Sequence, residues 1–112
     1  MKNILSVRRL LFGVVVSSIS LLSFSVSAHS PVCNCYNDEE GENQIICEGG
    51  FSDGASAEGV AIRVLDDRER VLINGVMSED STFTFARPDA DFHVVYDAGD
   101  SHQVTVYMDE IE

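Results

Sequence analysis

The sequence predicts an all-β protein in which short antiparallel strands form a sandwich or a barrel. From residue 43 onward, apolar and polar residues alternate in short segments, which is typical of strands with one buried face. Turn-forming Gly, Asn, Asp and Pro residues separate these segments at a spacing of roughly ten residues. No segment after residue 29 shows a helical period.

The expected strands follow one another along the chain. Residues 43–48 form the first, and 60–65 form the second because two sets of apolar residues alternate there. Residues 70–74 form the third, and the Asn74-Gly75 pair predicts a hairpin turn after it. The remaining expected strands are 81–87, 92–97 and 104–108. Much of the core should come from Phe83, Phe85, Phe92, Val94, Tyr96, Val104 and Val106.

Residues 1–28 have the features of a secretory signal peptide. Three basic residues precede a mostly apolar stretch, 10–24, and small residues then lead to Ala28. The apolar stretch is shorter than the ~20 residues that span a bilayer, and serines interrupt it, so we expect cleavage rather than a retained anchor. The mature chain would begin at His29, in the periplasm or outside the cell, and would not span the membrane.

The chain that would follow cleavage is strongly acidic. Residues 29–112 contain 4 of the 7 basic residues and all 19 acidic residues, so their formal net charge is −15. This charge disfavours binding to nucleic acid and to anionic membranes, and it favours cations or basic partners. Solubility of a small secreted protein would explain many of the carboxylates as well. We expect an irregular, cysteine-containing segment, 29–42, followed by a single β-sandwich domain, 43–112.

Three cysteines give an odd number of thiols near the start of the mature chain. Cys33 and Cys35 are separated by one residue, and Cys47 belongs to the first expected strand. One interpretation is a disulfide from Cys47 to either Cys33 or Cys35, because two cysteines so close in sequence rarely pair with each other. The other is a metal site, because thiolates bind copper, zinc, nickel or cobalt and an imidazole can complete the ligand set.

Two histidines are candidate ligands beside the thiols. The new N-terminal amine and ring of His29 can chelate copper, an arrangement that resembles the histidine-brace sites of copper-binding periplasmic proteins. His102 follows Asp97 and Asp100 in an expected turn, and turn formation explains these aspartates equally well. His93 is out of phase with the apolar face of its strand, so we expect it to be exposed.

Four stretches of the chain resemble carboxypeptidase regulatory-like (transthyretin-like) domains. Residues 50–54 and 59–66 are similar to the opening of such a domain, and residues 78–85 and 89–99 are similar to its later turns and strands. The resemblance covers about residues 48–108. It implies a seven-stranded Greek-key β-sandwich of the prealbumin type. Ser81 departs from the pattern, because the family usually has glycine there.

A shorter resemblance concerns metal transport. Residues 97–102, Asp-Ala-Gly-Asp-Ser-His, are similar to a turn in small periplasmic proteins that accompany nickel and cobalt importers of the energy-coupling-factor type. This resemblance implies a transition-metal cargo and a membrane importer as partner.

The sequence leads to two main hypotheses about function. The first is an exported, non-enzymatic module that binds nickel, cobalt or copper, with candidate ligands His29, Cys33, Cys35, Cys47 and His102. Its partner would be a membrane metal importer or another envelope protein. The alternative is a structural or protein-interaction domain without a metal, stapled by a disulfide, that acts through a sheet edge or its acidic face. No catalytic motif is present, so we expect no enzyme, and a thiol oxidoreductase is only a distant third hypothesis because Cys-x-x-Cys is absent.

Overall fold

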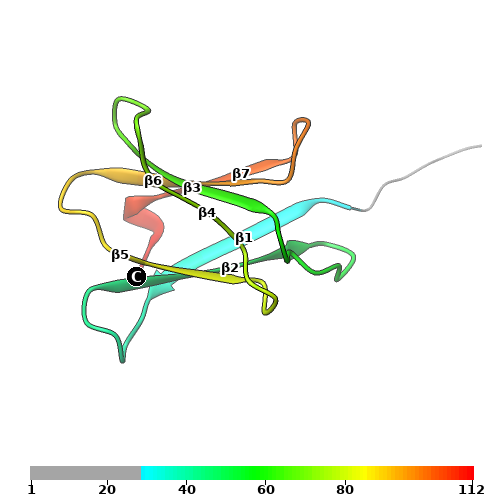
Figure 1. Cartoon of the computed structure of the whole chain (residues 1–112), viewed down its shortest axis with the longest axis horizontal. Coiled ribbons are helices and arrows are strands. Elements are labelled where there is room, and N and C mark those ends of the chain that lie inside the picture. The colour runs from blue at the N-terminus through cyan, green and yellow to red at the C-terminus, as the bar shows by residue number, and fades with distance from the viewer. Residues whose placement is uncertain (1–28) are drawn as a thin grey trace, which may run out of the picture.

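The structure, a computed structural model, describes residues 29–112. The expected signal peptide, 1–28, lies outside the described residues. Between residues 29 and 112, seven strands form two antiparallel sheets that lie one above the other (Figure 1). The all-β prediction is therefore confirmed. The same residues contain no helix with the length and apolar character that crossing a bilayer would require.

The two sheets contain different numbers of strands. The three-stranded sheet has the order β1-β2-β5, with β1 (Pro31–Asn37), β2 (Gln44–Phe51) and β5 (Thr82–Ala86). The four-stranded sheet has the order β4-β3-β6-β7, with β4 (Val71–Val76), β3 (Ala61–Asp66), β6 (Phe92–Asp97) and β7 (Gln103–Tyr107). A 3₁₀ turn, Met108–Glu110, follows β7.

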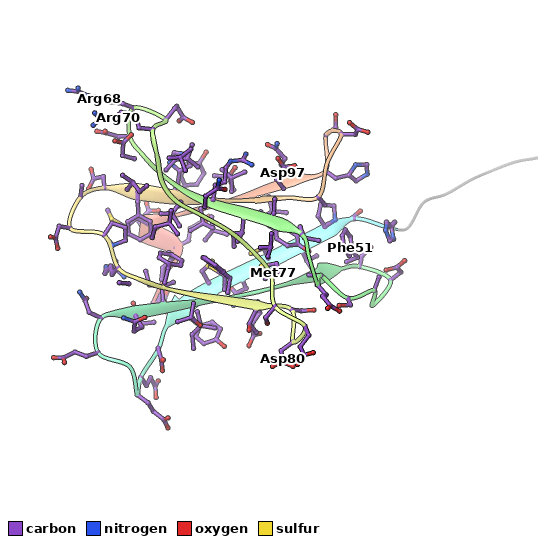
Figure 2. The ribbon with its side chains drawn as sticks, in the orientation of Figure 1. Phe51, Arg68, Arg70, Met77, Asp80 and Asp97 are labelled. Atoms are coloured by element: carbon purple, nitrogen blue, oxygen red, sulfur yellow. A yellow bond between two sulfur atoms is a disulfide. The ribbon has the colours of Figure 1, made fainter. Side chains whose placement is uncertain are left out.

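The core lies between the facing sides of the two sheets. Five of the predicted core residues are buried: Phe85, Phe92, Val94, Tyr96 and Val106. Phe83 and Val104 are partly buried and pack against them. Residues outside the expected strands also contribute, namely Ala57, Met77 and Ile111. Figure 2 shows Met77 between the layers. Strand alternation cannot predict these residues, because Ala57 and Met77 lie in connections between strands and Ile111 lies in the C-terminal segment after the 3₁₀ turn.

The expectation of an irregular segment at 29–42 is wrong, because Pro31–Asn37 forms β1. This strand pairs with β2 along its whole length. Its inward-facing positions include Cys33 and Cys35, whereas Asn34 between them is exposed, so the alternation is present but is carried by cysteines. The backbone N–H of Asn37 also donates to the carbonyl of Glu112 at 2.9 Å, which ties the end of β1 to the C-terminal residue.

The hairpin expected at Asn74-Gly75 is also wrong, because both residues lie inside β4. The chain reverses earlier, between β3 and β4, where Asp66 Oδ1 accepts hydrogen bonds from the backbone N–H groups of Arg68 and Arg70 at 2.9 Å. Such a side-chain-to-backbone contact is a turn-forming device of aspartate. Gly75 serves close packing instead, since a Cβ atom there would collide with the ring of Phe83.

Gly49 plays a similar packing role inside β2, which continues to Phe51 although the strand was expected to end at residue 48. A Cβ atom at Gly49 would lie only 2.6 Å from Cε1 of Tyr96. The Tyr96 side chain is fully buried, and its hydroxyl donates to the carbonyl of Gly50 at 3.0 Å. Glycine therefore allows the two sheets to approach each other where Tyr96 crosses between them.

Ser81 adopts the left-handed backbone region, with φ of 63°. This conformation favours glycine, because a side chain is strained there. Serine has a local compensation, because its Oγ accepts a hydrogen bond of 2.9 Å from the backbone N–H of Ala57. The Ser81 carbonyl also accepts from the N–H of Gly49 at 2.9 Å, so this turn, which joins β4 of one sheet to β5 of the other, is hydrogen-bonded to β2.

Candidate functional site

The three cysteines lie together on the inner side of the three-stranded sheet. Cys33 and Cys35 are two residues apart on β1, so their side chains lie on the same face. The turn after β1 brings Cys47 of β2 directly opposite Cys35. All three sulfur atoms lie within 4.8 Å of one another.

Cys35 and Cys47 form a disulfide. We expected Cys47 to pair with either Cys33 or Cys35. It pairs with Cys35, its partner in the strand register, and the Cα atoms of these two residues are 4.0 Å apart. Both cysteines are almost completely buried. A sulfur in a disulfide has no thiolate to offer a metal, so in this state the cluster has one free thiol.

That free thiol belongs to Cys33, which is half-buried beside the disulfide and packs against the core. Its register partner on β2 is Gly49, the residue that leaves room for the Tyr96 ring. Removal of the thiol from water raises its pKa to about 11. Since the thiolate is the nucleophile, Cys33 is mostly protonated and a weak nucleophile at neutral pH while the disulfide is intact.

His29 packs on the end of the sandwich. Its ring stacks on that of Phe51, with ring centroids 4.7 Å apart and an angle of 4° between the planes. Its Nδ1 lies 2.7 Å from Oδ2 of Asp53. This hydrogen bond is the largest cause of a lowered Asp53 pKa. A chelate through the amine and Nδ1 of His29 would have to break the contact with Asp53, whereas Nε2 is not engaged by it.

His102 lies in the turn between β6 and β7, where Figure 2 places Asp97. Its Nδ1 is 2.8 Å from the carbonyl oxygen of Asp100, so Nδ1 carries the proton of that hydrogen bond. Asp97 accepts from the N–H of Gly99 at 2.9 Å and from Arg63 at 3.2 Å. These two bonds help to lower the Asp97 pKa, that of Gly99 most strongly. The Asp97 carboxylate therefore has a structural role at the start of the turn.

Of the five predicted ligands, the structure brings together the three cysteines. His29 and His102 are each hydrogen-bonded to another partner. The strands beside them, β2 and β6, do end on the same side of the sandwich, where the ring centroids of Phe51 and Tyr96 are 6.4 Å apart. Within residues 29–112, the cysteine cluster is the group whose ligand atoms are close enough for a common ion. A metal site that includes either histidine remains a prediction.

The outer face of the four-stranded sheet carries a second site that the sequence analysis missed. An open pocket of about 500 Å³ lies there, over β6, β7 and the turn between β3 and β4. Its lining combines carboxylates with an aromatic and aliphatic surface: Asp67, Glu69, Asp91, Phe92, His93, Val95, Gln103, Thr105 and Tyr107.

His93 lies in this pocket rather than projecting freely into solvent. As expected, it is on the outer face, but only 14% of its side chain is exposed. Its Nε2 is 3.6 Å from a carboxylate oxygen of Glu69, and its ring centroid is 5.9 Å from that of Tyr107. A signal was available in the sequence, because β6 has Val95 as well as Phe92, Val94 and Tyr96, which makes both of its faces apolar.

Comparison of the chain with protein-family models, with curated proteins and with solved structures found no match to any of them.

Proposed function

We propose that this chain is an exported, non-enzymatic β-sandwich domain that acts by binding another protein of the cell envelope. Strand β4 carries the proposal. It is an edge strand of the four-stranded sheet, and none of its six residues is charged. The exposed fractions of Val71, Leu72 and Val76 are 51%, 44% and 59%.

Edge strands of soluble proteins usually carry charges, prolines or a covering segment that prevent pairing with other chains. The edge strand β1 has such features, because it begins with Pro31 and its last residue is bonded to the C-terminus. β4 lacks charge and proline, and it presents aliphatic side chains. These properties suit the addition of a partner strand, in which the backbone supplies hydrogen bonds and the side chains supply apolar contact.

Covalent bonding within the other sheet agrees with this proposal. The Cys35–Cys47 disulfide fixes β1 to β2, so that a small domain outside the cytoplasm can remain folded while it presents β4. The charge of −15 for residues 29–112 favours a partner with basic character.

A site-specific crosslink tests the proposal. A photoreactive amino acid at Leu72, in the protein exported by its own cells, should yield a discrete adduct with one envelope protein. The same amino acid at the exposed Asn34 of β1 is the matched control and should yield none. Val76→Lys in the Leu72 derivative should abolish the adduct while the protein stays folded. Equal labelling from positions 72 and 34 would contradict the proposal.

A soft-metal site is the second candidate function, carried by the proximity of the three sulfur atoms. Sulfur ligands at ~2.3 Å from a tetrahedral ion lie about 4 Å from one another, and the three sulfurs here are within 4.8 Å. After reduction, Cys33, Cys35 and Cys47 would therefore be suitably placed to bind copper, nickel or cobalt. Nε2 of His29 or His102 would be a further ligand, and a membrane importer would receive the ion.

Native mass spectrometry separates the two functions. The oxidised protein should bind no ion through sulfur. The reduced protein, exposed in turn to nickel, cobalt, copper(I) and zinc, should take up one ion, and Cys33→Ser should lose it. A reduced protein that stays free of metal in all four cases would exclude this second function and leave the first intact.

We make two further proposals, one about the export of the chain and one about the topology of the sandwich. Cleavage after Ala28 would place the chain in the periplasm or outside the cell, and N-terminal sequencing of the exported protein should give His29. The sandwich would also have the prealbumin-type Greek-key topology. Support comes from the chain passing from one sheet to the other after β2, after β4 and again after β5.

A further inference from the structure

We propose that the pocket over β6 and β7 binds an arginine side chain of the partner protein. This inference rests on the proposed interaction function and names the chemistry of the partner. The pocket lies on the same outer face of the four-stranded sheet as the exposed Leu72 side chain of β4, so one partner can reach both.

The pocket has an apolar floor on the outer face of the sheet, where side chains are usually exposed. Val95 belongs to the outer face of the sheet, yet only 8% of it is exposed. Leu65, which is next to His93 in register on the same face, has an exposed fraction of 7%. Within residues 29–112, the other sheet packs against the opposite face of these strands, so it does not account for their burial. The face is therefore partly desolvated already, which lowers the cost of seating an apolar portion of a guest.

Tyr107 forms one wall of the pocket. Its side chain is 56% exposed and stands beside the His93 ring. Its backbone N–H donates to Glu110 Oε1 at 2.9 Å, which closes the chain into the 3₁₀ turn after β7. A planar cation can stack on an exposed aromatic face of this kind.

Three carboxylates complete the lining, those of Asp67, Glu69 and Asp91. Glu69 has a φ of 64° in the turn between β3 and β4, and a carboxylate oxygen of Glu69 lies 3.6 Å from Nε2 of His93 at the pocket. None of the residues that line the pocket is Arg or Lys. Of the two cations in that turn, Arg70 is bound to Asp66 at 2.8 Å, and Figure 2 shows Arg68 and Arg70 at the tip of the molecule.

Arginine matches this combination better than lysine does. Its guanidinium is planar, so one group can stack on Tyr107 and still donate several hydrogen bonds to carboxylates. Its methylene chain can cover Val95. A lysine ammonium is a point charge that would gain from the carboxylates but would stack poorly.

Amide chemical shifts of the isotope-labelled mature protein test the inference, with acetyl-Ala-Arg-Ala-amide as the probe. The matched control peptide contains citrulline, which keeps the shape of arginine and removes its charge. We expect the arginine peptide to shift amides of residues 91–95 and 103–107, with millimolar affinity. Glu69→Gln and Tyr107→Ala should each weaken binding by about threefold to tenfold. Glu79→Gln, which removes an exposed carboxylate outside the pocket, should leave binding unchanged.

The outcomes distinguish this inference from the proposed function. Equal shifts with the citrulline peptide, full binding by Glu69→Gln and Tyr107→Ala, or no shifts at all would each overturn the arginine pocket. Binding of a lysine peptide as tight as that of the arginine peptide would overturn the choice of arginine. None of these results would remove a crosslink from position 72, whereas absence of that crosslink would contradict the interaction function itself.

Discussion

The two sheets of this sandwich are stabilised by different means. The three-stranded sheet contains the disulfide, two of whose neighbours on the inner face are the free thiol of Cys33 and the unsubstituted backbone of Gly49. The four-stranded sheet has no such bond and is built from aliphatic and aromatic side chains, some of which are buried even on its outer face. The three-stranded sheet is thus fixed by a covalent bond, whereas the four-stranded sheet has the surface that is available for binding.

Among changes that test this difference between the sheets, loss of the disulfide should have the largest effect on the free energy of unfolding. Replacing both Cys35 and Cys47 by alanine removes a link between residues 12 apart in sequence, and should lower the free energy of unfolding by about 3 kcal/mol. Urea denaturation gives the value. Cys33→Ala is the control and should cost far less, because that thiol is only partly buried and has no covalent partner. Equal losses in the two variants would contradict the assignment of the disulfide as the main support of this sheet.

A substitution at the point where the two sheets approach closely should have the next largest effect on stability. Gly49→Ala places a methyl group against the buried Tyr96 ring, and should cost about 1–3 kcal/mol by overpacking. Gly50→Ala is a matched control in the next position of β2, since its Cβ would have no neighbour closer than 3.7 Å. Thermal unfolding of the two variants should differ clearly. Similar melting temperatures would show that Tyr96 can move away at little cost.

Acid should destabilise the four-stranded sheet through Asp66, whose carboxylate accepts two backbone hydrogen bonds and one from the Arg70 side chain. These bonds lower its folded-state pKa, with the backbone bond from Arg70 as the largest cause. The stabilisation is thus present above the unfolded-state pKa of about 3.9 and is lost as the pH falls through the folded value. Asp66→Asn should lower the melting temperature at pH 7 and flatten its decline below about pH 4. A decline as steep as that of the wild type would assign the acid sensitivity to other groups.

Ser81, in the turn that connects the sheets, should show the smallest effect. Ser81→Ala keeps the left-handed backbone and loses the hydrogen bond to Ala57, so it should cost about 1 kcal/mol. Ser81→Gly loses the same bond but relieves the backbone, so it should be close to neutral. Chemical denaturation of the pair measures the backbone contribution directly. The interpretation fails if alanine is tolerated better than glycine.

Sequence patterns predicted the strands whose inner faces are aliphatic or aromatic. β6 is the clearest case, because Phe92, Val94 and Tyr96 repeat at every second position. β1 escaped prediction because its inner positions carry cysteines beside turn-forming residues, and only its register with β2 reveals the alternation. The Asn74-Gly75 pair misled for a different reason. Local turn propensity was overridden by the packing of Phe83 against Gly75, which is a contact between segments of different sheets.

The candidate sites were predictable to unequal degrees. A disulfide from Cys47 to Cys33 or Cys35 was one of two interpretations of the sequence, beside a metal site, and the choice of Cys35 depends on the strand register. The pocket depends on residues from three separate segments of the chain, and no single spacing in the sequence connects Glu69 with Tyr107.

The position of Cys33 affects the register in which β1 pairs with β2. A slip of β1 by one residue would turn its inner side chains outward, but a slip by two residues would keep every side chain on its present face. Such a slip would bring Cys33 opposite Cys47, with Cys35 opposite Ile45 instead. The face pattern alone thus discriminates poorly between the two alignments. The disulfide between Cys35 and Cys47 fixes one of these two alignments covalently. Oxidation therefore sets the register of β1 on β2 as well as stabilising the pair.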